Sequence, residues 1–144
     1  MGALTDNLRR FLDGQPVGVL ATRSAEGNPR QSLVYFARED DRLVVSTLAN
    51  RLKAQDVRRS GSASLCVMGH EPPYPSATFS GQAEILTEDI GPLTARVMQR
   101  MTRAPEPPEA MSDEALRKVG RVILAITVER VTAASYIDAA TSRS

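Results

Sequence analysis

The sequence is poor in the residues on which many catalytic and metal sites depend. It has one cysteine, one histidine and no tryptophan among 144 residues. One cysteine excludes an intrachain disulfide framework and a cysteine-only metal site, and one histidine excludes a multi-histidine metal site. Cys66 lies in an apolar run, so we expect a buried, inert thiol. His70 stands beside a proline-rich loop, which predicts a solvated side chain.

Several signatures of common enzyme classes are also missing. The chain has no dinucleotide-binding glycine motif, no P-loop and no nucleophile elbow, which removes the usual basis for Rossmann binding or serine hydrolysis. A hydrolase with paired carboxylates stays open on composition alone. Most acids, however, fall at turns, where they serve the backbone. We therefore predict no catalytic acid or base and no metal ligand.

Charge and hydropathy indicate which partners and which compartment to expect for the protein. The formal net charge is +1, which gives no argument for nucleic-acid binding through bulk electrostatics. The N-terminus lacks an apolar signal segment, and no apolar run approaches the roughly 18 residues of a membrane span. We therefore expect a cytoplasmic protein that contacts neither nucleic acid nor membrane.

The hydrophobic pattern predicts one domain, residues 1–144, that is mainly β. The predicted strands are 17–22, 30–37, 43–47, 62–68, 76–86 and 121–131. Tight turns join the first three, which we expect to form an antiparallel meander. The last strand is apolar on both faces, so the barrel interior plus a helix, or else a partner chain, must cover it. The set predicts a small, partly open β-barrel of six to seven antiparallel strands with helices on its rim.

Helices and irregular positions complete this picture. Thr5 or Asp6 is expected to cap a first helix that ends at Gly14. Gly81, in the middle of a long strand, suits a bulge. Thr87 is expected to cap a helix from residue 89 to about 103, in which Met101 would pack in the core.

The stretch 42–59, RLVVSTLANRLKAQDVRR, breaks a local rule. It reads as a strand, a short turn and a helix capped by Asn50. The positive end of a helix dipole favours acids, yet Arg51 and Lys53 occupy the first turn. Together with the hydroxyls of Ser46 and Thr47, these cations predict an anion site, most simply for a phosphate. The alternative is a solvated basic helix end that binds nothing.

Four motifs give the chain a family resemblance. They are GVLATRSAEGNPRQSLVYF (18–36), VVSTLANRLKAQDVRR (44–59), FSGQAEI (79–85) and RVILAITVERV (121–131). With them the chain resembles the pyridoxamine-5′-phosphate-oxidase-like split β-barrel superfamily, which is FMN-binding-like in fold. Within it, the chain is most similar to the small members that bind the deazaflavin coenzyme F-420.

The resemblance implies a cofactor site at the interface of a homodimer. In the family, a strand-end hydroxyl and the two cations after it hold the cofactor phosphate, which corresponds here to Ser46, Arg51 and Lys53, with Thr47 beside them. The second strand lies along the ring system of the cofactor. The residues implied as ring contacts are Gln31, Ser32, Leu33 and Val34, with Met68 as a further candidate.

The resemblance also implies an oxidoreductase. Reduced F-420 would deliver a hydride to an electron-poor small molecule, such as a tetrapyrrole like biliverdin, a quinone or an enone. The missing tryptophan argues against pyridoxamine phosphate oxidation, and the missing histidines argue against haem handling. Two alternatives stay open: an FMN-dependent oxidoreductase of the same fold, and a non-enzymatic protein that binds a cofactor or ligand.

Overall fold

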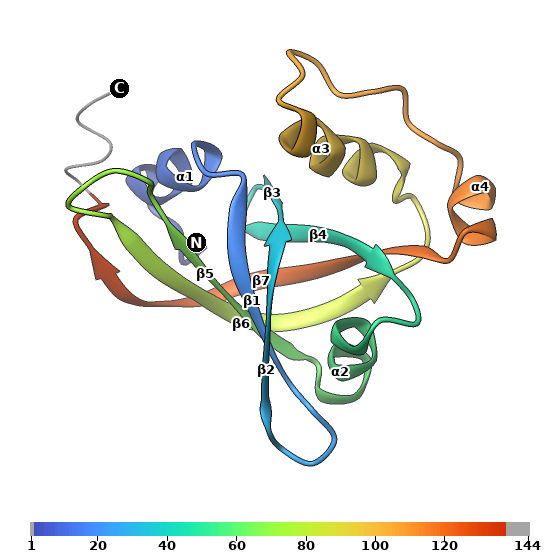
Figure 1. Cartoon of the computed structure of the whole chain (residues 1–144), viewed down its shortest axis with the longest axis horizontal. Helices are drawn as coiled ribbons and strands as arrows, with labels where there is room; N and C mark the ends of the chain where they lie inside the picture. Colours follow the sequence, from blue (N-terminus) through green and yellow to red (C-terminus); the bar gives the residue numbers. More distant parts are fainter. Residues whose placement is uncertain (1, 138–144) are drawn as a thin grey trace.

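The computed structural model describes residues 2–137, which form one curled antiparallel sheet with four helices around it (Figure 1). The strands are β1 (Val17–Arg23), β2 (Pro29–Tyr35), β3 (Ala37–Glu39), β4 (Arg42–Leu48), β5 (Ser62–Met68), β6 (Ser76–Leu86) and β7 (Arg121–Ser135). The helices are α1 (Asp6–Asp13), α2 (Leu52–Ser60), α3 (Gly91–Thr102) and α4 (Asp113–Lys118). The strand order is β2-β1-β5-β6-β7-β4-β3, which confirms the mainly β, split-barrel prediction.

Two apolar clusters occupy the two faces of the sheet. The larger fills the inside of the curl, where Leu124 and Ile126 of β7 are fully buried. The smaller lies on the other face, where Ile123 and Ala125 pack with α3 and with Leu116 of α4. Alternation along β7 therefore sends successive side chains into different cores. Barrel interior and helices cover the two faces of this strand, one of the two arrangements that its sequence predicts.

The bulge expected at Gly81 is present. The pairing of β6 with β7 shifts register between Ser80 and Gly81. At this point the two backbones approach so closely that a Cβ on Gly81 would lie 1.8 Å from the carbonyl oxygen of Thr127. Only glycine fits such an approach, and the bulge helps the long strand to bend around the interior.

Helix α3 is tied to the beginning of the chain through arginine. The Arg100 guanidinium donates to the carbonyl oxygens of Asp13, the last residue of α1, at 2.7 Å, and of Gln15, just after it, at 2.5 Å. A cation at a helix C-terminus also complements the helix dipole. Helix α1 itself begins as predicted, with the Thr5 hydroxyl accepting the Leu8 N–H. These contacts fix α3 above β4 (Figure 1).

The predicted meander of the first three strands is wrong. The stretch 30–37 breaks at Phe36, whose side chain is fully buried and whose N–H donates to Pro16. Residues before the break form β2, which pairs with β1, and residues after it form β3, which pairs with β4. β2 and β3 therefore lie at opposite edges of the sheet. The apolar run continues from Leu33 through Phe36 to Ala37, so the local pattern carries no sign of the break.

Two predicted helix caps are also wrong. Arg51, not Asn50, occupies the cap position of α2, and no side chain caps it. Helix α3 begins at Gly91, later than predicted, and Thr87 does not cap it. Instead the Asp113 carboxylate accepts the N–H groups of the two residues before α3, at 2.7 and 3.2 Å. This long-range contact replaces the local cap.

The predictions for the single histidine and the single cysteine have different outcomes. His70 is exposed in its loop, as predicted. The expectation of a buried thiol is wrong, because Cys66 points to the outer face of β5 and is exposed. Within residues 2–137, no helix has both the length and the hydropathy needed to cross a bilayer.

Candidate functional site

A groove of about 560 Å³ opens where both halves of the chain meet. Its lining comes from the end of β2, the end of β4, the start of α2, helix α3 and the segment that follows α3. The end of α4 and the start of β7 complete it. This size falls within the range of small-molecule sites, roughly 300–1,000 Å³.

One end of the groove is cationic. Ser46 and Thr47 end β4, Arg51 and Lys53 follow at the start of α2, and Arg121 begins β7. The lining residues include no Asp or Glu. Three cations and two hydroxyls without a counter-ion form a site that an anion would complete.

The charges at this end repel one another. Burial, and then the nearby Arg51, hold the pKa of Lys53 below its usual value. The guanidinium of Arg121 lies 3.5 Å from the Ser46 hydroxyl, at the limit of a hydrogen bond, and reaches over the end of β4. A bound phosphate would relieve this repulsion, because it would stabilise the charged form of each cation.

Other cations of the stretch 42–59 are used inside the protein. Arg42 pairs with Glu39, Arg59 contacts Asp56, and Arg58 donates to a backbone carbonyl at 3.1 Å. In the described part of the chain, the side chains of Arg51 and Lys53, which line the groove, form no hydrogen bond or ion pair with protein. Of the five basic residues in this stretch, these two are therefore available to a ligand.

The backbone at the start of α2 adds further donors. Leu52 and Lys53 are the first residues of the helix, and within residues 2–137 their N–H groups meet no acceptor of the protein. Such free N–H groups, at the positive end of the helix dipole, favour an anion. The absence of a side-chain cap therefore leaves this helix end open toward the groove.

A buried carboxylate holds α2 in place. Asp56 accepts hydrogen bonds from Arg30 of β2 and Thr22 of β1, each at 2.8 Å. The bond from Arg30 is the main reason that the pKa of Asp56 lies below its usual value. This contact joins α2 to β2, two elements that both contribute to the lining of the groove.

The other end of the groove is apolar. Met98 and Met101 of α3 and Met111 of the following segment line it, together with Leu33 and Tyr35 of β2. The prediction that Met101 packs in the core is wrong, because this side chain is 51% exposed. Met98 precedes it by three residues and faces the same side of α3. The groove is thus amphipathic, with charge at one end and thioethers at the other.

The structure brings most of the candidate site residues together. Those that line the groove are Ser46, Thr47, Arg51, Lys53, Leu33 and Val34. Those that lie outside its lining are Gln31, Ser32 and Met68. Only the C-terminal end of β2 borders the groove, so Gln31 and Ser32, which come earlier in this strand, do not line it.

Sequence reasoning missed Arg121 and the methionines as groove residues. Arg121 stands opposite Leu48 in the pairing of β7 with β4, and this pairing carries it to the cationic end of the groove. The strand at 121–131 was recognisable from its apolar run, but its partner strand was not. The methionines had the right helical spacing, and their exposure depends on which face of α3 meets the sheet.

A family model described as pyridoxamine 5′-phosphate oxidase matches residues 4–135. Among solved structures, a conserved hypothetical protein, Rv2991 from Mycobacterium tuberculosis, is 23% identical, with a TM-score of 0.71 over 90% of this chain and 83% of that one. An F420 reductase is 21% identical, with a TM-score of 0.71 over 90% of this chain and 98% of that one. At these identities, the two structures establish a shared fold.

A curated relative matches over a shorter stretch. DENN domain-containing protein 1A of Mus musculus is 34% identical over 94 residues, which are 62% of this chain. The matched part spans 9% of that protein, so its activity is not carried to this chain. The family model, in contrast, covers nearly all of the described residues. By its sequence and by its curled seven-stranded sheet, the chain belongs to the pyridoxamine 5′-phosphate oxidase family of split β-barrels.

Proposed function

We propose that the protein is an oxidoreductase that binds coenzyme F-420 in this groove and passes a hydride to an electron-poor small molecule. The observation that carries the proposal is a groove with three cations and no acid at one end and an apolar lining at the other. A cofactor made of a phosphate-bearing chain and a flat ring has this same division. The fold shared with an F420 reductase adds support.

The residues of the chain bind and orient in this proposal. Arg51 and Lys53 would neutralise the phosphate, and the hydroxyls of Ser46 and Thr47 would donate to its oxygens. Leu33 and its neighbours at the end of β2 would lie along the ring. The cofactor supplies the hydride chemistry when bound, so the protein needs no acid or base of its own for that step. The substrate class is an electron-poor ring, quinone or enone, including tetrapyrroles such as biliverdin.

Two other functions use the same groove. An FMN-dependent oxidoreductase would hold the FMN phosphate with the same cations. A non-enzymatic carrier would bind a cofactor or hydrophobic ligand tightly without turnover. The cationic end serves all three functions equally, and ligand preference separates them.

The test is a fluorescence titration of the purified protein with F-420 and, separately, with FMN. We expect micromolar or tighter binding of F-420 and weaker binding of FMN. The opposite preference would assign the protein to FMN chemistry. Binding of neither would reject a cofactor role for the groove, and tight binding without reduction of any quinone, enone or tetrapyrrole would favour the carrier.

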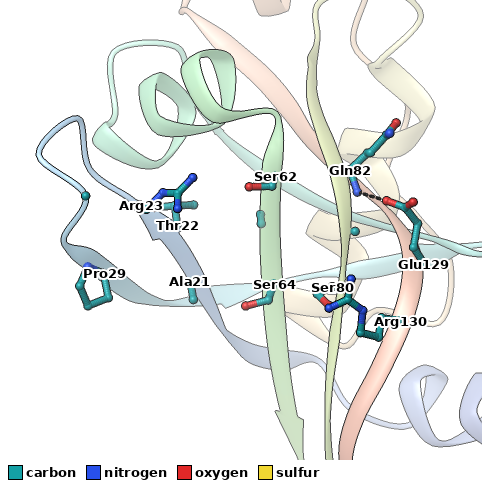
Figure 2. Close-up of a pocket in the computed structure, with 13 residues that line it drawn as sticks. Ala21, Thr22, Arg23, Pro29, Ser62, Ser64, Ser80, Gln82, Glu129 and Arg130 are labelled. Carbon is teal, nitrogen blue, oxygen red and sulfur yellow. Dashed lines mark hydrogen bonds between the residues drawn. The ribbon is translucent and has the colours of Figure 1, made fainter.

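We also propose that the protein is a homodimer that pairs through the outer face of β1, β2 and β5. Val19, Leu33 and Met68 are exposed on this face. Beside them lies a shallow hollow of about 550 Å³ whose small side chains, among them Ser64 and Ser80, leave the sheet open to close approach (Figure 2). An exposed apolar sheet face of this kind is typical of an interface. Light scattering should give twice the mass of one chain, and a monomer at micromolar concentration would reject the proposal.

A further inference from the structure

The apolar end of the groove is made of side chains that the core does not use. Met98, Met101 and Met111 are 43%, 51% and 47% exposed, although Val97, next to Met98, is buried. Leaving three large apolar side chains in water is unfavourable, at about 25 cal/mol per Å² of apolar surface. Their gathering at one end of one groove indicates a binding surface, because exposed apolar side chains that serve no purpose are scattered singly.

We propose that these methionines bind a flat aromatic ring, so that the groove selects molecules that join a fused ring system to an anion. The inference rests on the proposed function, because it assigns the ring end of the same site. Thioether sulfur is polarisable and makes favourable contacts with aromatic rings. Met98 and Met101 lie one helical turn apart on α3 and thus present two such groups side by side.

The cationic end decides the kind of occupant. Arg51, Lys53 and Arg121 line the same groove as the methionines, so a molecule that fills it meets charge and thioethers together. An uncharged apolar ligand would leave the cations unneutralised, and a simple anion would leave the methionines in water. A compact molecule that carries both a ring and an anion satisfies the whole lining.

The methionines also determine how many different ring shapes the groove accepts. Its three rotatable bonds let it follow rings of different outline, whereas a wall of branched side chains would fit one shape. Met111 comes from the segment between α3 and α4, so the wall combines a rigid helix with a loop. We therefore expect the groove to accept fused rings of several outlines.

The test replaces the two helical methionines, Met98→Gln with Met101→Gln, because glutamine keeps the length and helix propensity of methionine but is polar. The probes are F-420, FMN and 1-anilinonaphthalene-8-sulfonate, a dye with a fused ring and one anion. For each probe that the wild type binds, the double variant should lose about tenfold in affinity. The double leucine variant, which restores an apolar wall, should stay within about threefold of the wild type.

The matched control is Tyr74→Gln. Tyr74 is 51% exposed, the same as Met101, but it lies in the loop between β5 and β6, outside the groove lining. This variant should keep wild-type affinity for every probe. Unchanged affinity in the double glutamine variant, or an equal loss in Tyr74→Gln, would overturn the inference.

The dye separates this inference from the proposed function. Methionine-dependent binding of the dye, in a protein that binds neither F-420 nor FMN, would keep the ring site and reject the cofactor assignment. Binding of F-420 that does not depend on the methionines would keep the function and reject the ring site. Thermal unfolding of each variant identifies any loss that comes from misfolding.

Discussion

Replacing Arg51 and Lys53 together with glutamine is expected to weaken cofactor binding by about 3–6 kcal/mol, or roughly 10²–10⁴-fold, because each charge-assisted hydrogen bond is worth about 1.5–3 kcal/mol. Neither side chain forms a hydrogen bond or ion pair with protein in the described part of the chain, so the fold should remain intact. Fluorescence titration gives the affinity, and thermal unfolding checks the fold.

The control removes two charges elsewhere. Arg117 and Lys118 are exposed at the end of α4, outside the groove lining, and their double glutamine variant changes the net charge equally. It should bind like the wild type. Equal affinities in the wild type and in both double variants would mean that the start of α2 is a solvated basic helix end that binds nothing.

The pH dependence of the same titration has a definite sign. In the proposed function Lys53 would bind phosphate in its charged form, and burial lowers the pKa of Lys53 in the free protein. Affinity should therefore begin to fall, as pH rises, below the ordinary lysine value of about 10.4. Lys53→Arg should flatten this fall, since arginine stays charged.

Replacing Gly81 with alanine is expected to destabilise the protein by about 3 kcal/mol, at the upper end of the cost of overpacking. The added Cβ would meet the carbonyl oxygen of Thr127 at 1.8 Å, so the backbone of β6 or β7 must move. The clash involves backbone on both strands, which cannot relax by changing a rotamer. The unfolding midpoint in urea and the melting temperature measure the effect, which corresponds to a fall of about 10 °C.

Gly14→Ala is the matched control for this prediction. Gly14 has a φ of −86°, which alanine adopts, and a Cβ there would lie 3.5 Å from its nearest neighbour, an ordinary contact. Its stability should change by less than about 1 kcal/mol. If both variants unfold at the wild-type midpoint, the close approach of β6 and β7 at the bulge is wrong.

Local sequence determined most strands and the cationic end of the candidate site. The sequence predicts β6 with its observed bounds, 76–86, because the proline-rich loop marks its start and the polar, acidic residues 87–89 mark its end. Ser46, Thr47, Arg51 and Lys53 share the groove because all four lie within eight residues, at one strand end and the next helix start. Short-range order is enough to bring such neighbours together.

The tertiary structure alone decided the sheet order and the remaining half of the groove. The burial of Phe36 divides one apolar run between opposite edges of the sheet, and the pairing of β7 with β4 brings Arg121 to Ser46 from 75 positions away. The exposure of Met101 depends on how α3 docks, which Arg100 fixes through carbonyl groups near the N-terminus. These features arise from contacts between distant segments, and a periodic pattern records that a side chain is apolar without recording what it will meet.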